Sequence, residues 1–598
     1  DAVEGGGLGG LIIGTNGDGV SDALERNIIG GMADDVIQTW GGTNQGVIIA
    51  GNYIGVGIDG KTPLPNGKFV RMNATLAVIG TNLDGVSDAL ESNIIANHSG
   101  TLIRYPSPNL VFSFRGNHLF NNSEYVFERK EESFYADEVG DDSIPLNPTL
   151  QAPTDSSRLV GEVLISAGSG LAPAEVDLYL ADPSTVGTSP QGAHYLGTFV
   201  DNGPLDADDR IRHFDFDLSS LSYPQSGEAH FVVLSYIAVE NDDTLYGMSD
   251  YSEPYAVLLE STQDDDNSAG PSLQDGTITV NSSANTNEAD SQLTLVEAIL
   301  LANGELTRNL TSSEQQQVMG MLKTPTIVFD IPTEITPQVI EVPEGGLPPI
   351  VASNVTIDGY TQPGAVANSA SILEPNNAVI GIVIDARNGN HTGQASGSGE
   401  GDILTILGDD VLIQGLSFLN TFETAEGGSN YGINWRDGAS GGRISGCWVG
   451  LHPDGKTVAG GEIAVGACAT AGKHIIGTNG DGENDTAEFN IILGHNVNTI
   501  FEEAADCRIS GNFIGVLPDG LSTISASDAE KVGEGDAVEG GGLGGLIIGT
   551  NGDGVSDALE RNIIGGMADD VIQTWGGTNQ GVIIAGNYIC LLYTSDAA

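Results

Sequence analysis

The chain has 598 residues, of which 84 are glycine and 17% are charged, and its formal net charge at pH 7 is −60. This charge argues against nucleic-acid binding, which needs a basic surface, and against adhesion to anionic membranes. The sequence contains no apolar run of about 18 residues, so we expect no transmembrane segment. We expect the negative charge to be screened by salt or by bound cations.

The first feature along the chain is the phrase IIGTNGDGVSDALERNII at residues 12–29, which returns in related form at 78–95, 476–492 and 547–564. Each copy places a β-branched pair before Gly-Thr-Asn, followed by an Asp-Gly turn, further acidic residues and Asn-Ile-Ile. This order predicts a strand, a turn and a second strand.

The spacing of the repeats predicts the architecture. The phrase RISG at 443–446 recurs at 508–511, a shift of 65 residues, and the first phrase recurs after 66. Such a superperiod divides into three coils of about 22 residues, each of which buries its apolar face against the next coil. Helical periodicity is absent from these segments. We therefore predict an all-β fold, a parallel β-helix, whose right hand is the usual expectation for parallel crossovers.

Two long segments of the chain are identical. Residues 1–54 and 536–589 match at all 54 positions, which indicates a recent tandem duplication or an assembly artefact. The first is followed by GVGIDG and the second by CLLYTSDAA, residues 590–598, which we interpret as an artefactual tail. On this interpretation the natural order runs from about 273 to 589 and continues with 55–260.

Changes in composition predict the domains. Residues 1–148 are expected to form the C-terminal coils of a β-helix, and the alternating strands of 149–260 an Ig-like β-sandwich. Residues 261–272 are an acidic linker. Residues 273–589 are expected to form capping helices and a second β-helix.

Two segments are predicted to cap the ends of the coil arrays. The polar, aromatic segment 125–135 is expected to close the first domain. In the last domain, Thr294 and Glu297 form the capping box of a short helix that ends near Gly304 and seals the first coil. The segment 312–322 predicts a second helical stretch.

The motif LTLVEAI at 293–299 resembles the CSLREA-type signature that opens many bacterial surface β-helix proteins. Its Leu, Glu and Ala match as Leu295, Glu297 and Ala298, whereas Leu293 and Val296 replace its Cys and Arg. The segment 327–365 is similar to the entry coil of that family. The resemblance implies a pectin-lyase-like fold and a secreted or surface-attached bacterial protein, without a shared set of catalytic residues.

The acidic turns are candidate Ca²⁺ sites, because hard oxygen ligands at short spacing suit this ion. The predicted ligands are Asn16, Asp18, Asp22 and Glu25 in the first copy, Asn82, Asp84, Asp88 and Glu91 in the second, and Asn479, Asp481, Asp485 and Glu488 in the third. Gly14 occupies the first ligand position of an EF-hand loop, so an EF-hand is not supported. In the alternative interpretation these residues only form turns, and Asn27, Asn93 and Asn490 build an inward asparagine ladder.

Other chemistry is less well supported. Candidate catalytic groups are Asp409 and Asp410, Asp437 beside Arg436, and Asp385 near Arg387 and His391, although turns and surface ion pairs explain each of them. The acidic loop 201–209 is a weaker cation candidate. The residues Trp40, Trp435 and Trp448 can stack on sugars, but coil packing is the simpler role. An inward ladder is expected for Cys447, Cys468 and Cys507, because an odd count without a CxxC pair argues against disulfides or zinc.

These patterns favour a non-catalytic, calcium-stabilised structural or adhesive repeat protein, secreted or at the cell surface. Its expected partners are polysaccharides or cell-surface glycans. The alternative is a β-helix carbohydrate-active enzyme, either a polysaccharide lyase or a glycoside hydrolase. An enzyme would require paired carboxylates, or carboxylates with Arg or Lys, in a lateral groove.

Overall fold

A computed structural model of the chain describes residues 1–40, 45–72, 76–104, 111–123, 126–128, 149–151, 158–163, 175–181, 191–201, 206, 213–217, 230–239, 242–248, 255–256, 276–319, 324–332, 337–343, 346–387, 402–420, 430–436, 438–468, 472–523, 536–542, 544–567, 570–575 and 579–590. Within these ranges, no helix has the length and apolar character needed to cross a membrane. The predicted linker 261–272 lies outside them.

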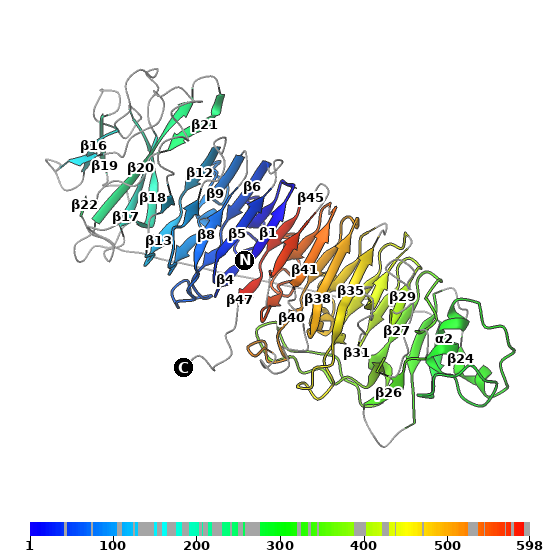
Figure 1. Cartoon of the computed structure of the whole chain (residues 1–598). Helices are drawn as coiled ribbons and strands as arrows, with labels where there is room; N and C mark the ends of the chain where they lie inside the picture. The colour runs from blue at the N-terminus through cyan, green and yellow to red at the C-terminus, as the bar shows by residue number, and fades with distance from the viewer. Residues whose placement is uncertain are drawn as a thin grey trace. The chain divides into compact units, whose positions relative to one another are not determined.

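The chain is nearly all β, with 44% of its residues in strands and 6% in helices. It divides into two compact units, Asp1–Asn267 (unit 1) and Ser268–Ala598 (unit 2). In Figure 1, unit 1 runs from blue to cyan-green and unit 2 from green to red.

Unit 1 contains three parallel sheets, and the chain visits them in turn (Figure 1). The first contains β1 (Val3–Gly6), β5 (Asp35–Trp40), β8 (Lys68–Arg71), β11 (Ile103–Arg104) and β14 (Phe127–Glu128). The second contains β3 (Ile12–Gly14), β6 (Gln45–Ala50), β9 (Leu76–Gly80) and β12 (Val111–Arg115). The third contains β4 (Ile28–Gly30), β7 (Tyr53–Ile54), β10 (Ile94–Ala96) and β13 (His118–Phe120). We call one passage through the three sheets a coil.

Unit 2 repeats this arrangement. Its first sheet contains β29 (Leu404–Ile406), β32 (Tyr431–Trp435), β35 (Gly461–Cys468), β38 (His495–Glu502), β41 (Asp536–Gly541) and β44 (Ile572–Thr574). The second contains β23 (Thr277–Val280), β25 (Thr326–Phe329), β27 (Thr356–Asp358), β30 (Leu412–Gln414), β33 (Arg443–Ser445), β36 (Ile475–Gly477), β39 (Arg508–Ser510), β42 (Ile547–Gly549) and β46 (Ile583–Ala585). The third contains β26 (Gln338–Glu341), β28 (Ile382–Asp385), β31 (Leu416–Leu419), β34 (Trp448–Val449), β37 (Ile491–Ile492), β40 (Phe513–Ile514), β43 (Ile563–Ile564) and β47 (Tyr588–Cys590).

The core of each stack consists of β-branched side chains in register. Ile13 pairs with Ile49, and Ile49 pairs with Ile79, and all three side chains are fully buried. Because successive side chains of a strand point to opposite faces, one residue in two faces the interior. A single coil leaves this face uncovered, so the stack of coils forms the core.

The predicted coil length of about 22 residues was wrong. Ile12 pairs with Ile48, 36 residues on, and Ile48 pairs with Val78, a further 30 residues on. The superperiod of 65–66 residues therefore contains two coils instead of three. Two kinds of corner alternate: an acidic turn separates β3 from β4, whereas only Gly51 and Asn52 separate β6 from β7.

Two antiparallel sheets with a shared apolar core follow the coils of unit 1. One contains β15 (Thr149–Gln151), β16 (Arg158–Glu162) and β19 (His213–Asp217). The other contains β17 (Glu175–Ala181), β18 (Gly192–Val200), β20 (His230–Val239), β21 (Asp242–Met248) and β22 (Tyr255–Ala256). Phe214 stacks on Phe216, with 4.7 Å between their ring centroids, inside this core.

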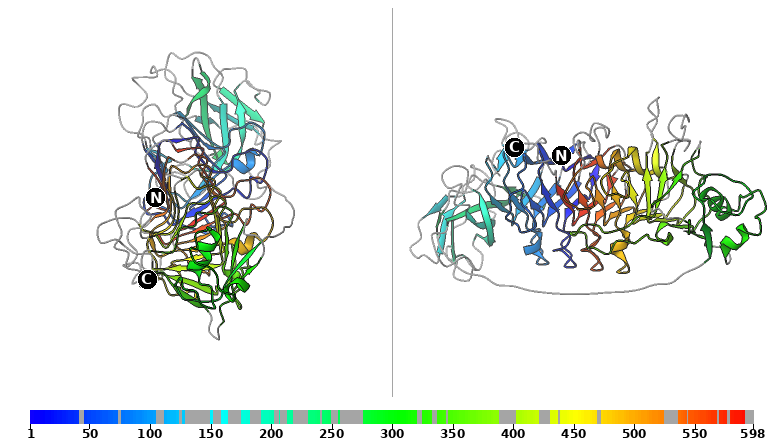
Figure 2. Two further views of the ribbon diagram at one scale, coloured as in Figure 1. Left: turned by 90° about the vertical axis from the view of Figure 1, so that its right-hand side faces the viewer. Right: turned by 90° about the horizontal axis from the view of Figure 1, so that it is seen from below.

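These antiparallel sheets cover the end of the unit 1 stack (Figure 2). The amide of Gly116 donates to the Tyr179 hydroxyl at 3.1 Å, and Asn122 donates to the Gln191 side chain at 3.0 Å. Arg115 pairs with Glu175 at 2.5 Å. The backbone and amide groups of the last coil thus find partners there. Most of the segment predicted to act as the cap, 125–135, lies outside the described residues.

The predicted capping helix of unit 2 is confirmed as α2 (Leu295–Ala302), which packs on β23 and has both hydrogen bonds of the Thr294–Glu297 capping box. The second helical prediction was too long. A 3₁₀ turn at Glu314–Gln317 is followed directly by the short strand Val318–Met319 (β24), which pairs with β23. Arg308 bridges the two elements, with its guanidinium 2.6 Å from Glu297 and 2.8 Å from Glu314.

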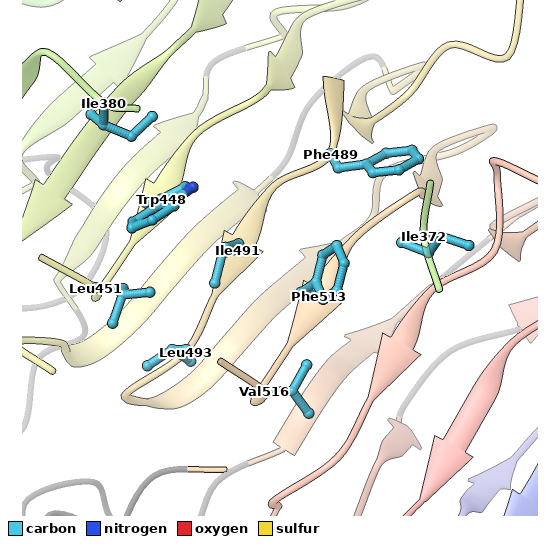
Figure 3. Packing of buried hydrophobic residues seen from close by; sticks show 9 residues of the cluster. All are labelled: Ile372, Ile380, Trp448, Leu451, Phe489, Ile491, Leu493, Phe513 and Val516. Atoms are coloured by element: carbon cyan, nitrogen blue, oxygen red, sulfur yellow. The ribbon is translucent and has the colours of Figure 1, made fainter. Parts of the chain in front are cut away.

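A segment that precedes β28 covers part of the outer surface of unit 2. Figure 3 shows Ile372 and Ile380 packed with apolar side chains of β34, β37 and β40. Asn368 donates to the carbonyl of Thr486 at 2.8 Å, and the amide of Asn376 donates to the carbonyl of Pro518 at 2.7 Å. Residues 368–380 therefore connect coils that are distant along the chain.

Candidate functional site

Each acidic turn is a closed hydrogen-bonded unit. In the first copy, the Thr15 hydroxyl donates to Asp22 at 2.7 Å, and the backbone amide of Asn16 donates to Glu25 at 3.1 Å. The Asn16 side chain donates to Asp18 at 3.2 Å and accepts from the Asp18 amide at 2.9 Å. Side chains of this kind favour turns because they hydrogen-bond to nearby backbone groups.

The same contacts recur in the other copies. The bonds from Thr to Asp join Thr81 to Asp88, Thr478 to Asp485 and Thr550 to Asp557, at 3.1, 2.9 and 2.8 Å. The bonds from Asn amide to Glu join Asn82 to Glu91, Asn479 to Glu488 and Asn551 to Glu560, at 2.9, 3.0 and 2.9 Å. The Asn side chains donate to Asp84, Asp481 and Asp553 at 3.3, 2.8 and 2.9 Å. The structure thus brings each predicted set together within one turn.

The turns also bind one another in pairs. In unit 1 the Ser87 hydroxyl donates to Asp22 of the preceding turn, and in unit 2 Ser556 donates to Asp485 in the same way. Each bond spans two coils and passes over the tight corner of the intervening coil. Asp22 therefore accepts one hydrogen bond from its own turn and one from the next turn.

The tight corner fits beneath the two turns because it begins with glycine. Gly51 has a φ of +72°, and a Cβ there would lie 2.6 Å from the carbonyl oxygen of Leu90 in the following turn. Its amide donates to the carbonyl of Glu91 at 2.6 Å. Gly511 makes the equivalent bond to Glu560 at 2.8 Å. A larger residue would force the turn away from the corner.

Asparagine ladders run beneath the turns, as the alternative interpretation of the sequence proposed. Each side-chain amide donates to the next side-chain oxygen at 2.8–3.0 Å, along Asn27, Asn52, Asn93 and Asn117 in unit 1 and along Asn490, Asn512, Asn562 and Asn587 in unit 2. All eight are fully buried. Because a buried amide without a partner costs about 1–3 kcal/mol, the ladders fix the coil register.

The turn glutamates differ in their charged partners. Arg443 lies 2.7 Å from Glu488, and Arg508 pairs with Glu560. Among the residues that the structure describes, no Arg, Lys or His nitrogen comes within 4 Å of Glu25 or Glu91. Burial raises the pKa of Glu25 to about 7, and the nearby Asp22 and Asp18 add to this rise. Burial also raises the pKa of Glu91.

The arrangement of the turn carboxylates bears on calcium. Within the described part of the chain, no acidic turn contains three His, Cys, Asp or Glu side chains whose ligating atoms lie within 4.8 Å of one another. Asn16 directs its amide nitrogen, a donor, at Asp18. The present geometry is that of a hydrogen-bonded turn, and a Ca²⁺ ion would need these oxygens to reorient. Calcium binding therefore stays a prediction.

The candidate catalytic carboxylates have structural partners. Asp409 accepts from the amide of Ser440 at 2.9 Å, which joins two coils. Asp385 accepts from Arg387 at 2.6 Å and from Asn420 at 2.7 Å. Together, Arg387 and Asn420 hold the pKa of Asp385 below its usual value.

Some predicted positions cannot be placed. Asp437 and His391 lie outside the described residues, as does most of the loop 201–209. The charged partner of Arg436 is Asp402, at 3.7 Å. Burial raises the pKa of Asp402, which also accepts from Asn434 at 3.0 Å.

The predicted cysteine ladder was wrong. Cys507 directly precedes β39, Cys447 follows β33 at the position that Asn512 occupies in a later coil, and Cys468 pairs with Glu502 on another sheet. The three tryptophans differ in exposure: Trp435 and Trp448 are buried, whereas Trp40 is 41% exposed.

Sequence reasoning missed the residues that join the turns to each other and to the coils. The Ser of the phrase recurs as Ser21, Ser87 and Ser556, and this recurrence is the signal that could have identified it. Arg508 recurs too, as Arg443 in the repeated RISG motif, but its partner Glu560 lies 52 residues away, so the recurrence does not identify the partner. No protein-family model, no curated protein and no solved structure matches the chain.

Proposed function

We propose that this chain is a non-catalytic structural or adhesive repeat protein, secreted or held at the bacterial cell surface. In this proposal the coils form a right-handed parallel β-helix, and the antiparallel sheets form an Ig-like β-sandwich that closes one end of it. Proposed partners are polysaccharides or cell-surface glycans.

One observation carries the proposal: in each unit, an Asp of one acidic turn accepts hydrogen bonds from its own turn and from the next turn. Asp22 accepts from Thr15 and Ser87, and Asp485 accepts from Thr478 and Ser556. These hydrogen bonds connect coils that are separated by one intervening coil. Repetition of this device supports a role in which the stack itself, as a stiff element, is the working part.

Turnover tests the proposal against the enzymatic alternative. The full chain is incubated with acidic and neutral polysaccharides, with calcium or with chelator, while new reducing ends and unsaturated products are followed. The proposal predicts no product. The control variant is D402N, because Asp402 is a buried carboxylate with a raised pKa whose charged partner is Arg436, a combination that an enzyme could use. Product formed by the parent chain and lost in D402N would refute the structural assignment.

A further inference from the structure

Trp40 is an exposed aromatic platform on the outer face of the first sheet of unit 1. It is 41% exposed and ends β5, where it pairs in register with Gly6 of β1. A Cβ on Gly6 would lie 2.6 Å from the Trp40 ring atom Cε3, so the absence of a side chain lets the indole lie against β1. Inward neighbours Val3 and Ile37 fix the strands in the core.

A row of polar side chains lies beside this platform on the same face. Gln38 precedes Trp40 by two residues, which places it about 7 Å away along the strand. Its amide donates to Glu4 at 2.8 Å, and its side-chain oxygen accepts from Arg71 at 2.9 Å. Three adjacent strands thus supply a carboxylate, an amide and a guanidinium in fixed orientation.

Arg71 differs from most described arginines of this acidic chain. Arg115, Arg443 and Arg508 each pair with a carboxylate. The described hydrogen bond of Arg71 goes to the Gln38 amide oxygen instead, and the residue is exposed. A guanidinium has five N–H donors, so Arg71 keeps donors that can reach a ligand on this face.

We propose that the outer face of β1, β5 and β8 binds a neutral glycan, with one pyranose ring stacked on Trp40 and its hydroxyls hydrogen-bonded by the row Glu4–Gln38–Arg71. Aromatic faces and a few oriented polar groups are the usual parts of a small-molecule site. The net charge of −60 disfavours an anionic glycan. This site rests on the adhesive function proposed above and names the class of its partner.

The chain contains its own control. The identical segment in unit 2 carries Trp575 over Gly541, but Trp575 is half-buried and packs against the cluster of Tyr431, Ile463 and Ile500. The corresponding Gln573 donates to Asp570 instead of joining a row with an arginine. The same sequence thus forms a platform in unit 1 and a packing contact in unit 2.

The test is calorimetric titration of the full chain with cellohexaose, using W40A, R71Q and W575A. We expect W40A to weaken binding about tenfold or more, R71Q to weaken it about threefold to tenfold, and W575A to leave it unchanged. Circular dichroism and melting temperature confirm that each variant is folded.

Cellohexaose binding that W40A leaves unchanged would overturn the proposal, as would the absence of any binding by the parent chain. Tighter binding of a hexagalacturonide that is lost in R71Q would overturn the assignment to neutral glycans. None of these outcomes depends on turnover, so failure here is distinguishable from failure of the proposed structural function.

Discussion

The two identical segments, residues 1–54 of unit 1 and 536–589 of unit 2, place the same acidic turn among different neighbours. In unit 2 the carboxylate of Glu560 pairs with Arg508 from the preceding coil. Burial raises the pKa of both glutamates, to about 7 for Glu25, but at Glu560 the Arg508 guanidinium opposes this rise. The sequence of a turn therefore fixes its hydrogen bonds, whereas the adjacent coil determines whether its buried glutamate has a cationic partner.

The largest expected effect comes from removing the arginine of unit 2. R508M leaves Glu560, whose side chain is fully buried, without its cation, and breaking a buried pair on one side costs about 3–5 kcal/mol. We expect a lower melting temperature at pH 8 and a smaller loss at pH 5, where Glu560 can take up a proton. R443M is the matched control with a smaller expected loss, because its partner Glu488 is more exposed. Equal melting of R508M and the parent chain at pH 8 would contradict this prediction.

The next effect is the pH dependence of the unit 1 turn. Because the folded-state pKa of Glu25 lies above its ordinary value of 4.5, its contribution to stability is present below pH 4.5 and is lost as the pH rises through about 7. The loss amounts to at most about 3 kcal/mol. E25Q should abolish this slope, which hydrogen exchange of the 12–29 turn between pH 4.5 and 8 would measure. An unchanged slope in E25Q would show that another group titrates.

Removal of calcium is expected to have a smaller effect on the melting temperature, and we expect the same effect for both segments. If Ca²⁺ binds at the turns, chelation lowers the melting temperature reversibly, and D18N with D553N removes this response. Metal analysis of the purified chain provides the direct control. An unchanged melt, together with no bound metal, would eliminate calcium and leave the hydrogen bonds alone as the stabilising contacts.

How much of this was predictable depends on how far apart the interacting residues lie. The capping box of Thr294 and Glu297 involves positions three residues apart, and it formed as predicted. The coil length was predicted wrongly because each superperiod contains two coils with different corners. The length of a repeat alone does not reveal how many coils it contains. The acidic turns were located correctly, but their cross-coil partners Ser87 and Arg508 depend on register, which only the stacked strands define.

On the outer surface of the two identical segments, contacts also depend on residues that are distant in the sequence. Trp40 and Trp575 have identical flanking residues, yet Ile500 of a neighbouring coil packs against the second tryptophan. Local sequence specified that each indole lies over a glycine. It did not specify which of the two remains accessible.

The central claim is that the turns hold alternate coils together, and a double-mutant cycle on Ser556 and Asp485 tests it most directly. Hydrogen exchange of the 547–564 turn is measured in the full chain and in S556A, D485N and the double variant. We expect each single change to lower the local opening free energy by about 1 kcal/mol or more, with a coupling of at least about 0.5 kcal/mol between them. S21A, which changes the equivalent serine of the first turn, is the matched control. Strictly additive effects of S556A and D485N would contradict the account.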